Sequence, residues 1–153
     1  MTQTLLLKNA RIIATMDDDQ REIDNGYILI RGNRIEAVGP MAECPDDADR
    51  TINLADHVVI PGLINTHHHM FQSLTRALPA AQNGELFDWL SALFPVWRNV
   101  TPAMQRAASR TAMAELMLSG CTTAADHAYL HVNGITLDLS LIHISEPTRL
   151  GMI

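Results

Sequence analysis

The chain has 153 residues, of which 47% are hydrophobic and 18% are charged, and its formal net charge at pH 7 is −6. This is the composition of an ordinary globular protein, and the negative charge argues against a nucleic-acid partner. The apolar run at residues 5–7 is too short for a signal peptide and no run approaches a membrane span, so we expect neither export nor insertion and predict a cytoplasmic protein. Cys44 and Cys121 fit no paired metal or redox spacing, so both are expected to be reduced thiols.

Residues 1–60 are predicted to form an antiparallel, sandwich-like β region. Short apolar or β-branched runs occur at residues 5–7, 11–14, 27–31, 34–38 and 57–60. Residues 24–26 and 31–34 supply the Gly and Asn that tight hairpins need, because these residues adopt positive φ at low cost. The acidic run at residues 17–19 is interpreted as a solvated loop rather than a cation site.

The segment PGLINTHHH, residues 61–69, predicts a buried strand that ends in metal ligands. Leu63 and Ile64 are apolar at successive positions, which is typical of a strand covered on both faces in a parallel sheet. Side chains alternate along a strand, so His67 and His69 are expected to point the same way, about 7 Å apart along the backbone, whereas His68 points away. We expect His68 to be a packed or hydrogen-bonded neighbour rather than a ligand.

Helical periodicity follows this strand. Residues 85–97 carry an apolar stripe with Pro95 near its end, and Thr101 followed by Pro102 is a strong helix start that runs to a closing Gly120. A second strand is predicted at residues 121–126, so residues 61–138 contain a strand–helix–strand unit, which requires a parallel sheet. Trp89, Phe94 and Trp97 are expected in the core rather than as a platform for a ring.

The last segment has a different character. Residues 139–149 read LSLIHISEPTR, which resembles the in-frame translation of a transposase-type sequencing adapter; the alternative is a half-buried strand. We therefore expect residues 139–153 to be a non-native tail, and the native protein to continue past Asp138.

Two stretches, PGLINTHHHMFQSLTRALPAAQNGELFDWL and LSGCTTAADHAYLH, resemble the metal-dependent amidohydrolase superfamily, and within it the branch of 8-oxoguanine deaminases close to hydroxyatrazine and guanine aminohydrolases. The resemblance implies an α/β fold in which a β region precedes a (β/α)8 barrel, here truncated after its first strand–helix–strand portion. It also implies a small purine-like or triazine-like substrate and a homo-oligomeric full-length protein. Asn65 stands where many members of the superfamily have aspartate.

The resemblance implies roles for five positions. His67 and His69 would be the first two ligands of one divalent metal, zinc by preference, with iron or manganese as alternatives. Gln72 would contact the substrate ring, although a surface glutamine is the competing interpretation. Asp126 and His127 would either line the pocket or cap their loop.

The remaining metal ligands and the general acid and base are expected beyond Asp138. A catalytic zinc usually keeps three protein ligands. The chain supplies two, so we predict weak metal binding and no activity for the chain alone.

Three functions remain open. The first is deamination of an oxidised purine such as 8-oxoguanine, and the second is removal of an alkylamine from a hydroxylated triazine. The third is a non-catalytic metal-binding or scaffold protein that keeps the first histidine pair.

Overall fold

The computed structural model describes residues 3–138, and the chain divides between residues 61 and 62 into two units. The proposed non-native tail, residues 139–153, lies outside the described residues. Within residues 3–138 no helix has both the length and the apolar character needed to cross a bilayer.

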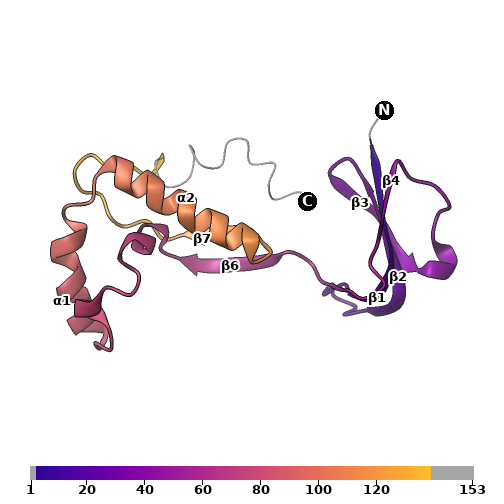
Figure 1. The fold of residues 1–153 in the computed structure, drawn as a ribbon, viewed down its shortest axis with the longest axis horizontal. Coiled ribbons are helices and arrows are strands. Elements are labelled where there is room, and N and C mark those ends of the chain that lie inside the picture. Colours follow the sequence, from indigo (N-terminus) through magenta and orange to yellow (C-terminus); the bar gives the residue numbers. More distant parts are fainter. Residues whose placement is uncertain (1–2, 139–153) are drawn as a thin grey trace. The chain divides into compact units, whose positions relative to one another are not determined.

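The amino-terminal unit is built on one mixed β-sheet (Figure 1). Its elements are β1 (Thr4–Ala14), β2 (Glu22–Arg31), β3 (Arg34–Pro40), the short 3-10 helix η1 (Met41–Glu43), β4 (Arg50–Asn53) and β5 (Val58–Val59). Strands β1, β2 and β3 are antiparallel neighbours, as the hairpin residues predict. Strands β4 and β5, however, both pair with β1 in parallel, so the prediction of a wholly antiparallel region is wrong in this respect.

Strand β1 joins two segments that the sequence pattern separates. The polar residues between the apolar runs predict a break, but the pairing with β2 continues through a register shift between Leu7 and Ala10. Asn9 lies in that shift with a φ of 61°, a left-handed conformation that Asn tolerates better than most residues. Leu6, before the shift, and Ala10 and Ile13, after it, are all buried.

The loop between β1 and β2 contains the acidic run. Asp17 accepts hydrogen bonds from Arg21 at 2.7 Å and from the Thr15 hydroxyl at 2.7 Å, and all three side chains belong to an exposed part of the loop. The carboxylate is therefore engaged in a local ion pair, consistent with a solvated loop.

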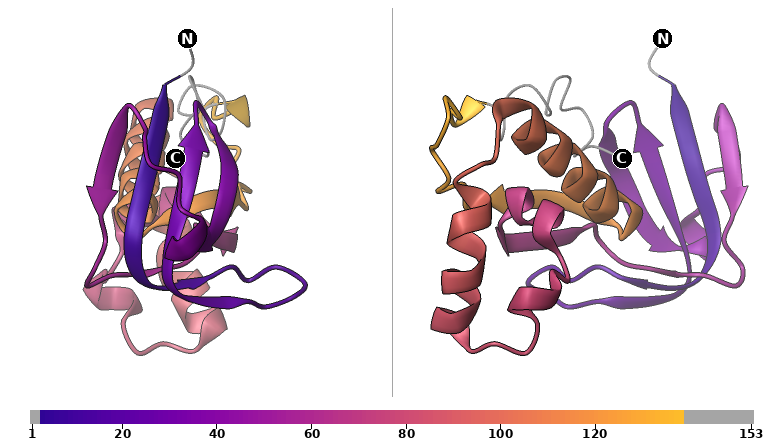
Figure 2. Two further views of the ribbon diagram at one scale, coloured as in Figure 1. Left: turned by 90° about the vertical axis from the view of Figure 1, so that its right-hand side faces the viewer. Right: turned by 60° about the vertical axis from the view of Figure 1, so that its left-hand side comes forward.

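The second unit contains the predicted strand–helix–strand arrangement. Its elements are β6 (Leu63–His68), the 3-10 helices η2 (Met70–Thr75) and η3 (Pro79–Ala81), α1 (Leu86–Trp97), α2 (Pro102–Leu118) and β7 (Cys121–Asp126). Strands β6 and β7 are parallel, so the prediction of a parallel sheet is confirmed. Helix α2 packs against η2 and along β7 (Figure 1 and Figure 2).

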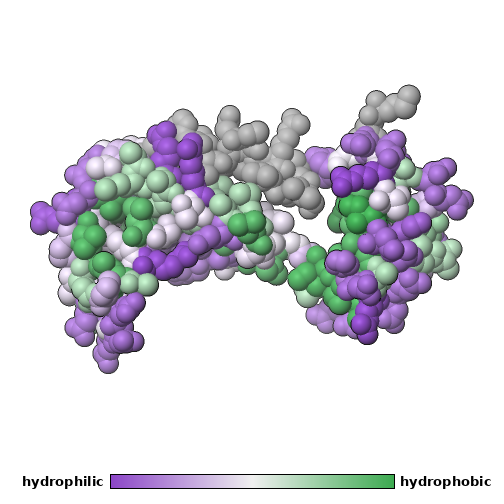
Figure 3. Space-filling view, viewed as in Figure 1, coloured by the Kyte–Doolittle hydropathy of each residue, from purple (hydrophilic) through white to green (hydrophobic). Residues whose placement is uncertain are grey.

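The burial of β6 differs from the prediction. Leu63 is 49% exposed and Ile64 is 69% exposed, although their pattern predicts cover on both faces. Among the described residues β6 pairs only with β7, so the strand has an open edge. Apolar surface is visible on both units in Figure 3.

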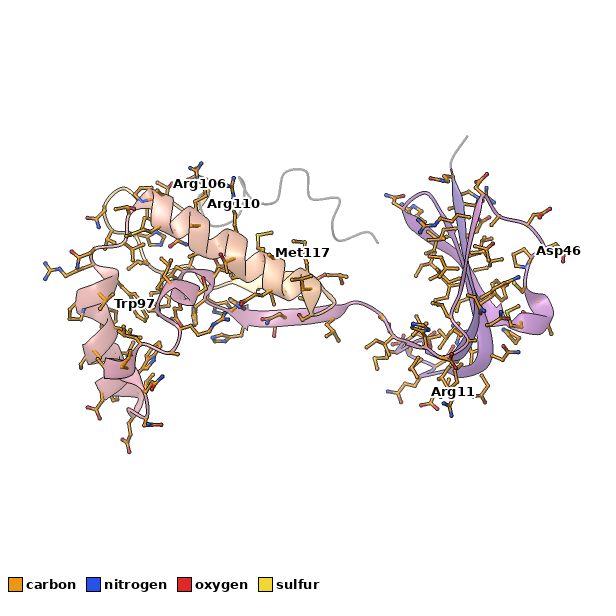
Figure 4. All side chains as sticks on the ribbon, in the orientation of Figure 1. Arg11, Asp46, Trp97, Arg106, Arg110 and Met117 are labelled. Atoms are coloured by element: carbon orange, nitrogen blue, oxygen red, sulfur yellow. The ribbon has the colours of Figure 1, made fainter. Side chains whose placement is uncertain are left out.

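Helix α1 buries only part of its predicted apolar stripe. Leu93 and Trp97 are buried, whereas Leu86 and Phe94 are more than half exposed, so the core position predicted for Phe94 is wrong. The helix passes through Pro95 and ends two residues later. The indole of Trp97 points from α1 into the unit (Figure 4), within a core whose buried members are Phe71, Ala81, Leu93, Trp97, Val100, Leu130 and Ile135.

Helix α2 follows its sequence signals closely. The Thr101 hydroxyl accepts a hydrogen bond from the Met104 backbone N–H, and Gly120 has a φ of 83° just past the end. Ala108 and Ala112 are fully buried, while Met104, one turn before Ala108, is half exposed.

Candidate metal centre

The two predicted ligands converge at the end of β6. The Nε2 atoms of His67 and His69 lie 3.1 Å apart, with the ring centroids 4.9 Å apart and the rings nearly perpendicular. Two nitrogens bound to one tetrahedral zinc at about 2.0–2.1 Å would be separated by roughly 3.3 Å. The pair therefore has the spacing that a single zinc ion requires.

The protonation of His69 follows from its neighbour. Its Nδ1 atom lies 2.8 Å from the backbone carbonyl oxygen of His127. A carbonyl oxygen only accepts, so Nδ1 carries the proton and Nε2 keeps its lone pair. Such a hydrogen bond to the distant nitrogen orients histidine ligands and raises their basicity in metal sites.

His67 is held from both sides. Its backbone N–H donates to the Asn65 side-chain oxygen at 3.1 Å, and its ring stacks on that of His127 with centroids 4.4 Å apart. The amide of Asn65 thus steadies the backbone next to the first ligand.

The end of β7 supports this arrangement. The Asp126 carboxylate accepts a hydrogen bond from the Met70 backbone N–H at 2.9 Å, where η2 begins. The His127 backbone N–H donates to the His68 carbonyl oxygen at 2.7 Å. The Nε2 atom of the His127 ring lies 3.3 Å from the Thr66 carbonyl oxygen. These contacts of Asp126 and His127 connect the end of β7 to the end of β6 and the start of η2.

The imidazole pair opens onto a cavity of about 410 Å³. Gln72 lies in its wall and donates from Nε2 to the Tyr129 hydroxyl oxygen at 2.8 Å. Burial raises the pKa of Tyr129, and the hydrogen bond from Gln72 opposes that rise. The residues that line the cavity are His67, His68, His69, Gln72, Ser73, Thr75, Arg76, Ala77 and Trp89.

Sequence reasoning missed some residues of this cavity and its surroundings. Arg76, in the wall, forms a bidentate pair with Glu115 at 2.8 and 2.7 Å, which lowers the pKa of that carboxyl group. Trp89, which was expected in the core, is half-buried, packs on Trp97 with centroids 5.4 Å apart and also lines the cavity. Tyr129 lies in the HAYL stretch three residues after Asp126, a position that a search for residues following β7 would have found.

A third ligand is not found in this part of the chain. Within residues 3–138 no three His, Cys, Asp or Glu side chains are grouped so as to hold a metal ion. The remaining imidazole of the run, His68, also lines the cavity, and its Nδ1 is buried without a hydrogen-bond partner among the described residues.

Comparison with known proteins shows the family of the chain. Residues 58–152 match the model of the amidohydrolase family, and the chain belongs to that family. It is 44% identical over 110 residues to 8-oxoguanine deaminase from Pseudomonas aeruginosa, an alignment that covers 72% of this chain and 24% of the relative. It is 36% identical over 152 residues to isoxanthopterin deaminase from an unknown prokaryotic organism, covering 96% of this chain and 31% of the relative.

Solved structures show the same fold. Atrazine chlorohydrolase from Arthrobacter aurescens TC1 complexed with zinc superposes with a TM-score of 0.81 at 28% identity, covering 94% of this chain and 33% of that one. An adenosine deaminase from Xanthomonas campestris with bound zinc superposes with a TM-score of 0.80 at 22% identity, covering 94% and 31% of the two chains. The chain thus spans about a quarter to a third of the length of these proteins.

Proposed function

We propose that the protein to which this chain belongs is a zinc-dependent aminohydrolase that deaminates an oxidised purine such as 8-oxoguanine and releases ammonia. The observation that carries the proposal is the pair of Nε2 atoms 3.1 Å apart in the wall of a cavity that also contains Gln72. The identity to 8-oxoguanine deaminase supports the substrate class, and the similarity to a zinc-bound hydrolase supports the metal.

Zinc bound by imidazoles lowers the pKa of a coordinated water to about 7 and so supplies an activated water at neutral pH. His67 and His69 would hold the metal through Nε2. The His127 carbonyl oxygen keeps the proton of His69 on Nδ1, so that its Nε2 lone pair stays free for the metal. Gln72 would hold the substrate ring, and Trp89 forms an apolar part of the cavity wall.

A second candidate function is the release of an alkylamine from a hydroxylated triazine. The triazine ring of this candidate is supported by the superposition on atrazine chlorohydrolase and on a triazine hydrolase from an Arthrobacter species, the latter with a TM-score of 0.79 at 28% identity. The two reactions differ in the leaving amine, so the released product separates them.

The test is made on the full-length protein, obtained by recovering the reading frame that contains residues 1–138. We expect one equivalent of zinc by elemental analysis and ammonia release from 8-oxoguanine. We also expect His67→Ala and His69→Ala to lower both the zinc content and the rate by more than about 100-fold, because each removes a ligand. His57→Ala is the matched control, since its imidazole lies in the amino-terminal unit and the hydrogen bonds of His57 are made by its backbone.

The outcomes separate the functions. Alkylamine released from hydroxyatrazine, without ammonia from 8-oxoguanine, would favour the second candidate. A zinc-loaded protein that acts on neither ring would indicate a metal-binding or scaffold protein. For the 153-residue chain alone, we expect weak zinc binding by isothermal titration and no ammonia release, because two imidazoles leave the metal under-coordinated.

A further inference from the structure

The ring of Tyr129 packs edge-to-face against aromatic neighbours. It meets Phe71 edge-on with centroids 5.2 Å apart, and it meets His69 in the same manner at 5.1 Å. The ring of Trp97 lies 6.4 Å away and is fully buried. Edge-to-face contacts of this kind are favourable and directional, so they restrict where the hydroxyl group points.

The Tyr129 hydroxyl group is hydrogen-bonded to the side-chain amide of Gln72. The Nε2 atom of Gln72 donates to the Tyr129 oxygen at 2.8 Å, and within residues 3–138 no donor reaches the other end of the amide, Oε1. Gln72 lies in the wall of the cavity beside the imidazole pair. A glutamine amide has one donor end and one acceptor end, so engaging the donor with Tyr129 leaves the acceptor for a ligand.

We propose that Tyr129 is a positioning residue that keeps the Gln72 amide oxygen turned toward the ligand, so that the site selects heterocycles that present a ring N–H. The proposal rests on the function proposed above. The part of the substrate placed against Gln72 is the five-membered ring, where 8-oxoguanine carries such an N–H next to its additional carbonyl group. A ring nitrogen with a lone pair would instead face the amide oxygen without a hydrogen bond, which disfavours that ring.

The opposite orientation of the Gln72 amide predicts a different substrate preference. If the Tyr129 hydroxyl donated to the amide oxygen, the NH2 group of Gln72 would face the cavity and the site would prefer bare ring nitrogens. The pair 8-oxoguanine and guanine separates the two arrangements, because 8-oxoguanine has N–H at both nitrogens of its five-membered ring and guanine has only one.

The kinetic test compares Tyr129→Phe and Gln72→Glu in the full-length protein. We expect Tyr129→Phe to raise KM for 8-oxoguanine about 10-fold with kcat changed less than about 3-fold, since the amide becomes free to turn. The preference for 8-oxoguanine over guanine should fall by about 10-fold. Gln72→Glu should keep that preference, because a carboxylate still accepts.

Tyr27→Phe is the matched control, since it removes the same hydroxyl group from a buried ring in the amino-terminal unit. Its KM and its preference are expected to stay at the wild-type values. An unchanged preference in Tyr129→Phe, or an equal fall of the preference in the turnover that remains in Gln72→Glu, would overturn the proposal.

A second readout requires no activity. In the 153-residue chain labelled with 15N, the side-chain amide resonance of Gln72, identified by its loss in Gln72→Glu, should shift in Tyr129→Phe and stay unchanged in Tyr27→Phe. If the full-length protein acts on neither ring but this shift occurs, the proposed function fails while the orientation of Gln72 stands. If the full-length protein releases ammonia but the Gln72 resonance does not shift in Tyr129→Phe, the proposed role of Tyr129 is wrong and the proposed function stands.

Discussion

Replacing Trp97 by alanine is expected to destabilise the second unit strongly while leaving the amino-terminal sheet folded. The indole is completely buried, and its N–H donates to the Thr75 hydroxyl oxygen at 3.0 Å. Its ring meets four other aromatic rings, with centroids between 5.2 and 6.4 Å away, those of Phe71, Trp89, Phe94 and Tyr129.

The magnitude follows from this environment. Truncation of a buried Trp or Phe to Ala costs about 3–5 kcal/mol, through the lost burial and the cavity that remains. Domains are stable by roughly 5–15 kcal/mol, so the loss is a large part of the total. Trp97→Phe keeps most of the ring and loses the hydrogen bond to Thr75, so we expect a smaller cost of about 1–2 kcal/mol.

Urea unfolding followed by circular dichroism measures these costs, and hydrogen exchange read by mass spectrometry localises them. We expect faster exchange in peptides from α1, η2 and α2, and unchanged exchange in β1 and β2, because the chain divides into two units. Phe87→Ala is the control on the same helix, since Phe87 is 80% exposed and should change stability by less than about 0.5 kcal/mol. A cost for Trp97→Ala no larger than that of the control, or equal loss of protection in both units, would refute the reasoning.

Two further predictions concern local structure. The hydrogen bond from Arg21 lowers the pKa of Asp17 to about 2, so the carboxyl signal in a 13C NMR titration should have its midpoint there and move toward 3.8 in Arg21→Gln. Because the pKa of Asp17 is lower in the folded than in the unfolded chain, the ion pair stabilises the fold above about pH 4, and this contribution is lost as the pH falls toward 2. An unmoved midpoint in Arg21→Gln would show that Arg21 does not cause the low pKa of Asp17. A Cβ added at Gly62 would overlap the Thr122 side chain, so Gly62→Ala should cost about 1–3 kcal/mol in chemical denaturation. Adding Thr122→Ala should recover part of that cost, and an equal loss in the double variant would show that the overlap is not the cause.

Features encoded by short-range patterns were predictable from the sequence. The limits of α2 follow from the Thr101 cap and from Gly120, both of which act within one turn of the helix. The common direction of His67 and His69 follows from the two-residue period of a strand. The parallel sheet follows from the order of strand, helix and strand.

The pairing of strands far apart in the chain was harder to predict from the sequence. Strand β4 was not predicted, because its sequence, RTIN, shows little apolar alternation and the strand forms through pairing with β1, more than 40 residues earlier. The exposed side of α1 was also misjudged, since the residues that cover the helix come from η2 and from the segment after β7. Periodicity identifies an apolar stripe, but the partners in the fold decide how much of it is buried.

The sequence by itself determined that two imidazoles lie on the same side of the chain at the end of a strand, because the alternation of side chains along a strand is a property of the local backbone. Only the tertiary structure decided which nitrogen of His69 is hydrogen-bonded and which atom of the Gln72 amide contacts Tyr129. Both depend on groups more than 50 residues away, the His127 carbonyl oxygen and the Tyr129 hydroxyl group. Parallel pairing of β6 with β7 brings those groups to the same edge of the sheet, and no local pattern records that contact.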